Sequence, residues 1–351
     1  MKNKQNLFEQ NSKNTLVRFF LSSLFTISFF YIIPIFINFA DKNFYTKEFK
    51  NNSKKILTYT LNSKEEKIDQ NSFINEEDVL IDIYSLNNSE SESIYLSAAT
   101  INQLFKETEY NLNDVRQNKL VKPIALTLLP NELKMIENTK KRKEFFIQIV
   151  LPLIIKENNI IKKDRRTLFD IINKSNNTTA ELSWLEKKYK QYGAKSKDLS
   201  TLKIRMDEIP VSLALAQAAK ETGWGTSRFA QEGNALFGQW TWSGEGLKPK
   251  NAKKGADHKV MKFNILQASV RAYQRNLNTH STYKDFRKAR AELRDSKKPL
   301  DSIKLSEFLN KYAETGNQYV EVLQKIIIQN KLQDFDDAKL LPSNSDLESL
   351  I

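Results

Sequence analysis

The sequence predicts a mainly α-helical fold (α+β) that includes one small β-hairpin. Apolar residues recur at helical spacing over residues 145–172, and an apolar, alanine-rich run covers residues 211–219. Residues 258–263 instead alternate apolar and polar side chains, as a strand does. Long helical periods with one short alternating stretch indicate a helical core with a hairpin at its edge.

The longest predicted helix begins after Pro130 and carries its apolar positions through residues 145–172. Pro152 is expected to kink this helix or divide it in two, because proline removes a backbone donor and clashes with the preceding turn. Polar residues 175–179 end the pattern. Further helices are predicted over residues 182–192, 268–277 and 305–332, the last of these divided at Gly316.

The predicted β-structure is small. Residues 239–242 and 258–263 form the two strands of the expected hairpin, and the glycines and lysines of residues 244–254 form an exposed loop between them. Residues 78–86 are rich in β-branched side chains and are predicted as a further strand.

The N-terminus predicts a membrane anchor. Residues 19–40 carry no charge, and this stretch is long enough to span a bilayer as a helix. Basic residues outnumber acidic ones in residues 1–18, so the positive-inside rule places this tail in the cytoplasm and the bulk of the chain across the membrane. A cleaved signal peptide is the alternative, but residues 38–40 make a poor cleavage site.

Composition narrows the chemistry. The net charge of +13 is concentrated in residues 131–298, and it favours an anionic partner such as nucleic acid, anionic lipid or anionic cell-wall polymer. An ordinary lysine-rich surface is the alternative. The absence of cysteine excludes disulfides, thiolate nucleophiles and cysteine-ligated metals. His258 and His280 have no metal-ligand spacing, and His280 is expected to cap a helix or pack. A serine-nucleophile turn and a glycine-rich phosphate loop are also missing.

Glu221 is the main candidate for carboxyl chemistry. It lies where the apolar helix of residues 211–219 ends, directly before Thr-Gly-Trp-Gly. A carboxyl at such a point can be partly desolvated, which raises its pKa toward the range of a general acid. Trp224 offers a face on which a sugar can stack. A glutamate that merely ends a helix and pairs with a lysine is the alternative.

Trp240 and Trp242 lie two residues apart and therefore point the same way on a strand. If exposed, they would form a stacking platform, and if buried, they belong to the core. The glycine-containing loop that follows favours the cleft.

Residues 214–240 resemble the signature of the glucosaminidase family, glycoside hydrolase family 73. Glu221, residues 222–225 and residues 234–238 match its pattern of a catalytic Glu before Ser/Thr-Gly-Trp-Gly, followed by Asn-x-Leu-Phe-Gly. A longer resemblance, to the Bax-like branch, runs from about Lys122 to about Asp337, roughly three fifths of the chain.

This resemblance implies a lysozyme-like fold, with a helical lobe, a small β-hairpin and a cleft between them. It also implies hydrolysis of the β-1,4 bond after N-acetylglucosamine in peptidoglycan, with Glu221 as the general acid and neither metal nor cofactor. Tyr273 falls where the family carries a functionally important tyrosine, although simple packing is the alternative. The expected substrate-binding residues are Trp224, Asn234, Phe237, Gln239, Trp240, Trp242 and His258.

The second catalytic carboxylate is the least defined part of the site. The family places it in the β-lobe, and Glu245 is our choice there. Asp257 and Glu232 are the alternatives, and a substrate acetamido group acting as nucleophile would replace all three.

Three hypotheses for function follow. The first is a glucosaminidase anchored in the bacterial inner membrane, facing the periplasm and binding peptidoglycan glycan strands rather than nucleic acid. The second is a lytic transglycosylase or muramidase on the same fold, and the third is a non-catalytic peptidoglycan-binding protein. The expected organisation is residues 1–18 (cytoplasmic tail), 19–40 (transmembrane anchor), 41–120 (spacer), 121–200 (helical N-terminal part of the Bax-like region), 201–337 (catalytic domain) and 338–351 (tail).

Overall fold

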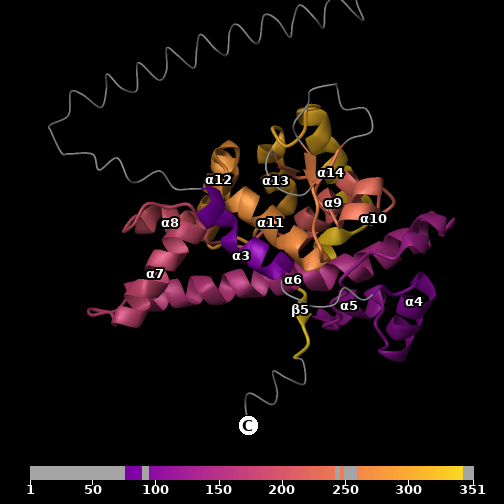
Figure 1. Ribbon diagram of the computed structural model, residues 1–351, viewed down its shortest axis with the longest axis horizontal. Coiled ribbons are helices and arrows are strands. Elements are labelled where there is room, and N and C mark those ends of the chain that lie inside the picture. The colour runs from indigo at the N-terminus through magenta and orange to yellow at the C-terminus, as the bar shows by residue number, and fades with distance from the viewer. Residues whose placement is uncertain (1–75, 89–94, 242–245, 249–258, 343–351) are drawn as a thin grey trace, which may run out of the picture. The chain divides into compact units, whose positions relative to one another are not determined.

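The computed structural model describes residues 76–88, 95–241, 246–248 and 259–342 (Figure 1). The predicted anchor over residues 19–40 lies outside these ranges. Within the residues that the structure describes, no helix is long and apolar enough to cross a membrane. The mainly helical fold predicted from the sequence is confirmed.

The α-helices are, in chain order, α3 (Glu76–Asn88), α4 (Ala98–Glu107), α5 (Leu112–Asn118), α6 (Thr139–Ile172), α7 (Thr179–Gln191), α8 (Leu199–Arg205), α9 (Val211–Thr222), α10 (Arg228–Gly233), α11 (Leu266–Thr279), α12 (Lys284–Asp295), α13 (Ser302–Ser306) and α14 (Asn317–Gln329). Short 3-10 helices are η2 (Asn131–Met135), η3 (Ser281–Tyr283), η4 (Glu307–Leu309) and η5 (Leu332–Phe335). The strands are β1 (Leu120–Val121), β2 (Trp240–Thr241), β3 (Gly246–Leu247), β4 (Lys259–Met261) and β5 (Lys339–Leu340).

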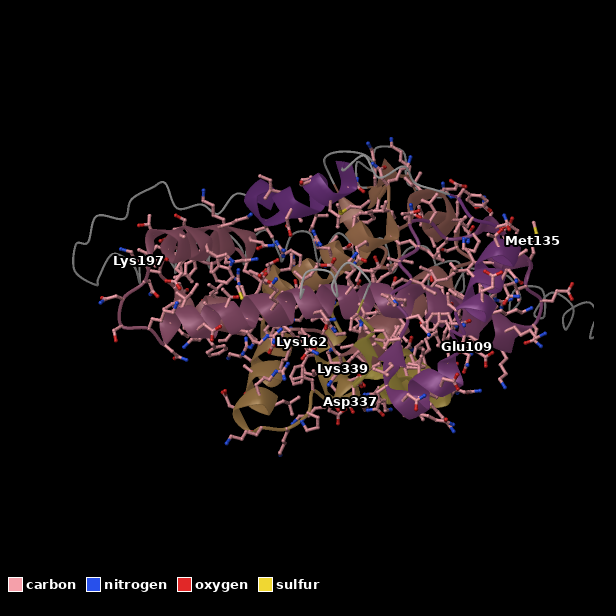
Figure 2. The ribbon with its side chains drawn as sticks, turned by 90° about the horizontal axis from the view of Figure 1, so that it is seen from below. Glu109, Met135, Lys162, Lys197, Asp337 and Lys339 are labelled. Atoms are coloured by element: carbon pink, nitrogen blue, oxygen red, sulfur yellow. The ribbon has the colours of Figure 1, made fainter. Side chains whose placement is uncertain are left out.

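Helix α6 is the longest of the described elements, with 34 residues, and it runs between α9, α11 and α14 on one side and α4, α5 and β5 on the other (Figure 1). Asn138 caps its N-terminus by accepting a hydrogen bond from Lys141 N at 3.0 Å. Seen from below, α6 runs between the end of the molecule near Met135 and the end near Lys197 (Figure 2). The helix continues through Pro152, so the predicted division at this proline is wrong. The residues around Pro152 are buried on almost every side, and this packing maintains the helix where local propensity opposes it.

Helix α9 lies at the centre of the core and packs against α6, α14 and η5. Its alanines are buried and carry only a methyl group, so neighbouring helices can approach its backbone closely. Its N-terminus is held by Asp336, whose carboxylate accepts hydrogen bonds from Ser212 N at 2.8 Å and Ser212 Oγ at 2.7 Å.

A second, smaller apolar cluster joins α7 and α8 to the far end of α6. Arg290 on α12 ties this part to α9, because its fully buried guanidinium donates to three backbone carbonyls. The acceptors are the carbonyl oxygens of Ile204, Asp207 and Glu208, at 2.9, 3.1 and 3.0 Å.

The predicted hairpin is confirmed and extended by one strand. β2 pairs antiparallel with β4, with Trp240 opposite Val260, and β3 pairs with the other edge of β4. A separate parallel pair, β1 with β5, joins Leu120 to Lys339 and so connects distant parts of the chain.

The strand predicted over residues 78–86 is wrong, because this segment is helix α3. A strand would place Ile81 and Ile83 on one face, yet Ile81 is 62% exposed while Ile83 is 1% exposed. Leu80, Ile83 and Leu86 recur every three residues and face one apolar cluster against α11, which is helical spacing. The prediction of a strand relied on the β-branched residues of this short segment and did not use the three-residue spacing of its apolar side chains.

Candidate functional site

The site is built where α9 ends. Glu221 lies in the last turn of α9, and Gly223 terminates the helix in the left-handed conformation. Three consecutive residues have positive φ: Gly223 (57°), Trp224 (61°) and Gly225 (80°). The chain therefore turns sharply immediately after the glutamate and leaves its carboxyl at the margin of the buried helix.

Thr222 holds this turn together. Its hydroxyl donates to Ala218 O at 2.6 Å and accepts from Gly225 N at 2.8 Å. At Gly225, a Cβ atom would lie 2.9 Å from Phe146 Cδ2 and 3.1 Å from Leu133 Cδ2, so only glycine fits. The glycines of the Thr-Gly-Trp-Gly sequence are thus required both by the left-handed backbone of the turn and by its close packing on α6.

Burial raises the pKa of the Glu221 carboxyl above its ordinary value. A hydrogen bond with the Tyr319 hydroxyl and the nearby charge of Lys220 lower this pKa and oppose part of the effect. Gly238 approaches from the other side, where a Cβ would lie 3.2 Å from Glu221 Oε2. The carboxyl is therefore partly desolvated and closely approached by its neighbours.

Tyrosines surround this carboxyl. Burial and, to a smaller extent, the charge of Glu221 raise the pKa of Tyr283 to about 12. Burial is also the main cause of the raised pKa of Tyr312 and Tyr319, and the charge of Glu221 adds to it in both. The rings of Tyr312 and Tyr319 stack with centroids 5.4 Å apart at an interplanar angle of 8°. Tyr312 donates its hydroxyl hydrogen to Phe237 O at 3.0 Å. Tyr283 comes from η3, Tyr312 from the segment before α14 and Tyr319 from α14, and the sequence alone did not single them out.

Comparisons with known proteins decide the family. The profile of the glucosaminidase family, described as mannosyl-glycoprotein endo-beta-N-acetylglucosaminidase, matches residues 197–332. Protein bax of Escherichia coli (strain K12) is 30% identical over 223 residues, which cover 62% of this chain and 76% of that protein. The chain belongs to the Bax-like branch of the glucosaminidase family. No solved structure matches it. Membership supports a glycosidase-type enzyme.

Within this glucosaminidase-family site, Tyr273 is buried rather than at the surface. Its ring is fully buried and stacks on Phe237 with centroids 3.8 Å apart at 8°. Its hydroxyl donates to Gln217 Oε1 at 2.7 Å. Phe237 is itself 1% exposed, so the stacked rings of Phe237 and Tyr273 belong to the buried core beneath the site.

Asn234 is also buried, and it organises the turn after α10. Its φ of 49° caps that helix, and its amide donates to Phe263 O at 2.9 Å. Gln239 is half-buried, and its backbone oxygen accepts from Met261 N at 2.8 Å. The Gln239 side-chain oxygen is buried and finds no hydrogen-bond partner within the described part of the chain.

Trp224 lies at the edge of the site. Its half-buried ring contacts Phe146 edge-on, with centroids 6.0 Å apart, and Lys143 Nζ lies 4.8 Å from its centroid. This arrangement leaves part of the ring accessible beside the turn that carries Glu221.

Several predicted site residues fall outside the described residues: Trp242, Glu245, Asp257, His258 and the side chain of Trp240. Their roles stay predictions. Glu232 is described, is exposed, and pairs with Arg228 at 3.1 Å, one helical turn away.

Across residues 76–88, 95–241, 246–248 and 259–342, no group of three or more histidine, cysteine or acidic side chains is placed to hold a metal ion. His280 caps η3, because its Nδ1 accepts from Thr282 N at 3.3 Å, as the sequence led us to expect.

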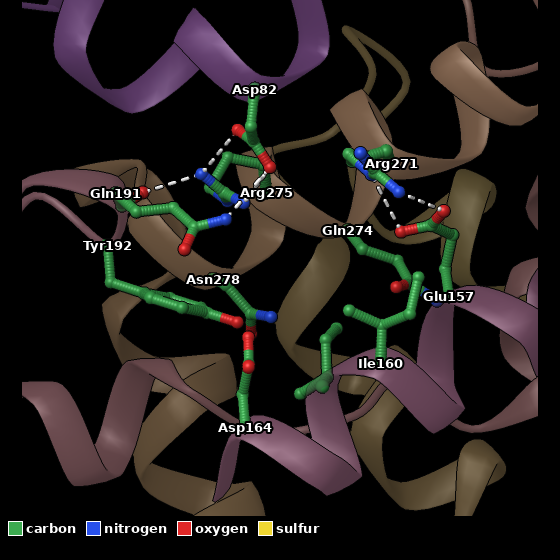
Figure 3. A pocket seen from close by; sticks show the side chains of 11 residues that line it. Asp82, Glu157, Ile160, Asp164, Gln191, Tyr192, Arg271, Gln274, Arg275 and Asn278 are labelled. Atoms are coloured by element: carbon green, nitrogen blue, oxygen red, sulfur yellow. Dashed lines mark hydrogen bonds and ion pairs between the residues drawn. The ribbon is translucent and has the colours of Figure 1, made fainter. Parts of the chain in front are cut away.

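A cavity of about 80 Å³, lined mostly by polar and charged residues, lies elsewhere, between α3, α6, α7 and α11, and Glu221 does not line it (Figure 3). Ion pairs close it on two sides. Arg275 binds Asp82 at 3.0 Å, and Arg271 binds Glu157 with both guanidinium contacts at 2.9 Å. Helix α11 thus contacts Gln217 of α9 through Tyr273 and presents charged residues to this cavity.

Proposed function

We propose that this chain is an endo-β-N-acetylglucosaminidase that hydrolyses the β-1,4 bond after N-acetylglucosamine in peptidoglycan. The observation that carries the proposal is the desolvated Glu221 carboxyl at the end of α9, within the motif that the glucosaminidase family shares. The lysozyme-like arrangement, with a helical lobe and a β-lobe flanking a cleft, is part of the same proposal.

In this mechanism Glu221 is the general acid. Its raised pKa keeps the carboxyl protonated closer to neutral pH, so it can donate its proton to the glycosidic oxygen as the bond breaks. Burial strengthens the electrostatic effect of each neighbouring group, because little water screens it. Trp224 supplies a half-buried ring in the turn that follows Glu221, suited to stacking on a sugar.

The second group completes the reaction in one of two ways. Glu245, or failing it Asp257, would activate water or form the covalent intermediate. Alternatively, the substrate acetamido oxygen attacks the anomeric carbon. Glu232 fits less well, because it is exposed and already paired with Arg228.

We further propose that residues 19–40 anchor the protein in the inner membrane with the catalytic domain in the periplasm. The uncharged stretch and the basic residues before it support this topology. Extraction of the full-length protein from membranes by detergent but not by carbonate, together with periplasmic protease sensitivity, is the expected result. Release by carbonate would refute the anchor.

The decisive experiment is digestion of purified sacculi by the full-length protein in detergent, with mass spectrometry of the released fragments. Glu221→Gln should abolish digestion while sacculus binding persists, and Glu232→Gln is the matched control. Fragments with reducing-end N-acetylglucosamine support the proposal. Anhydromuramic acid ends would instead identify a lytic transglycosylase, and unchanged digestion by Glu221→Gln would refute the assigned acid.

A further inference from the structure

The cavity beside α11 leaves three buried hydrogen-bond acceptors unused. Gln191 of α7 and both Gln274 and Asn278 of α11 line it, and their side-chain oxygens are buried without a hydrogen-bond partner among the residues that the structure describes. Gln274 is only 2% exposed and Asn278 only 1%. Buried polar atoms without a partner are costly and rare in folded proteins. Three such oxygens around one cavity of about 80 Å³ therefore indicate a bound group that donates hydrogen bonds.

The orientation of two of these amides is fixed by their nitrogens. Gln191 Nε2 donates to Asp82 Oδ2 at 2.8 Å, and Asn278 Nδ2 donates to Asp207 O at 2.9 Å. A carboxylate and a backbone carbonyl only accept hydrogen bonds, so neither amide can exchange its oxygen for its nitrogen without losing this contact. In both side chains the oxygen is the atom that remains unused.

Gln274 is oriented through Asn158 of α6. Asn158 is itself held by the backbone of Ile209, because its Nδ2 donates to Ile209 O at 2.8 Å and its Oδ1 accepts from Ile209 N at 3.2 Å. Gln274 must therefore face Asn158 Oδ1 with its nitrogen, which donates at 2.9 Å. The oxygen of Gln274 is left over, and it points into the cavity (Figure 3).

The charged side chains restrict the bound group further. Two of the three lining carboxylates are held by the guanidinium groups of Arg271 and Arg275. The third carboxylate, Asp164, pairs with Lys188, which lies outside the lining. An anion in the cavity would meet this carboxylate and three further acceptor oxygens, so the lining disfavours an anion.

A primary ammonium group fits this lining better than a metal ion or water does. In the described part of the chain, no three acidic side chains are placed to hold a metal ion together. A water molecule donates only two hydrogens, and it also needs a donor for its own oxygen. A primary ammonium group donates three hydrogens, accepts none and carries a positive charge. It therefore matches the three amide oxygens, with Asp164 as the nearest carboxylate that no lining cation holds.

We propose that the cavity beside α11 binds a primary ammonium group, either the free ammonium ion or the amine end of a larger molecule. The oxygens of Gln191, Gln274 and Asn278 accept its hydrogens, and Asp164 is its counter-ion. The site does not depend on the role proposed for Glu221. Because α3, α6, α7 and α11 all contribute lining residues, a bound ammonium group stabilises the packing of these four helices.

The test is thermal unfolding of the full-length protein in detergent and in a buffer free of amines. Ammonium chloride replaces sodium chloride at constant total salt, and the melting temperature should rise to a plateau, by about 2–4 °C at ten times the Kd. Methylammonium distinguishes the two sources of the group. An equal rise with methylammonium indicates the amine end of a larger molecule, and a rise with ammonium alone indicates the free ion.

Two glutamine variants of α11 locate the effect. Gln274→Met keeps the side-chain length and removes one acceptor, while Asn158 retains both bonds to Ile209, and the Kd should rise about tenfold or more. Gln267→Met is the matched control and should keep the wild-type Kd. Gln267 lies on the same helix, and its buried side-chain oxygen also finds no partner in the described structure, but it does not line the cavity.

Several results would overturn the inference. Absence of a saturable rise with ammonium would leave water as the occupant of the cavity. An equal rise with potassium or tetramethylammonium would show that positive charge alone is recognised, since neither ion donates N–H hydrogens. An unchanged Kd in Gln274→Met, or an equal loss in Gln267→Met, would place any binding elsewhere. If Gln274→Met fails to fold, Asn278→Leu takes its place, because Asp207 O retains its hydrogen bond from Arg290.

Discussion

Gly238→Ala tests the confinement of Glu221 most directly. Gly238 has a φ of 61°, and a Cβ at this position would lie 3.2 Å from Glu221 Oε2. That spacing is tighter than nine in ten real Cβ contacts, so the carboxyl must shift by a few tenths of an ångström. The substitution therefore adds one methyl group against the proposed acid and changes no other group in the site.

The expected magnitudes separate stability from activity. Left-handed backbone costs an alanine about 1–2 kcal/mol, and the reduced freedom of the unfolded chain offsets about 0.4–1 kcal/mol of this. The net loss of about 1 kcal/mol lowers the melting temperature by only about 2–4 °C. Activity should fall further, by about tenfold or more, because misplacing a catalytic group by about 1 Å can cost about 100-fold.

Dye release from labelled sacculi, measured beside thermal unfolding, checks both magnitudes. Gly193→Ala is the matched control, since Gly193 has a φ of 58° and the substitution carries the same backbone strain away from the site. If Gly238→Ala loses no more activity than Gly193→Ala, the argument for a confined carboxyl is refuted.

Two further predictions concern stability. Asp82→Asn should weaken the bidentate contact with Arg275, so limited proteolysis within α3 should become several-fold faster. Glu232→Gln, which changes an exposed ion pair, should not change the cleavage rate. Equal rates in both variants would show that the Asp82–Arg275 pair does not hold α3 in place. Burial raises the pKa of Asp336 from 3.8 to about 6, so its ionised form costs stability above pH 6, and the cost is relieved as pH falls toward 4. Asp336→Asn should stabilise the fold at pH 7.5 by on the order of 1–3 kcal/mol and lose this advantage by pH 4, as followed by denaturant unfolding; a pH-independent difference would contradict the assignment.

Periodicity was sufficient for much of the fold. The helices ending at Glu221 and before Gly193, the hairpin, and the break at Gly316 all follow from local pattern and turn residues. The errors arose where tertiary packing overrides local preference. Pro152 sits in a helix that is buried around it, and residues 78–86 are helical because α11 offers them an apolar surface.

The sequence predicted only the part of the site that belongs to the motif around Glu221. Glu221 stood out because a carboxyl follows an apolar helix and precedes two glycines. Tyr312 and Tyr319 did not, since aromatic residues at helical spacing usually pack, and only the fold brings them beside α9.

The two ends of α9 act differently on two buried carboxyls. Asp336 lies at the N-terminus, where the helix dipole and two hydrogen bonds from Ser212 favour its charged form. Burial outweighs both effects, so the pKa of Asp336 is still raised to about 6. Glu221 lies at the C-terminal end, where the same dipole disfavours a negative charge and adds to the effect of burial. The dipole therefore opposes the effect of burial at the structural cap and reinforces it at the proposed acid.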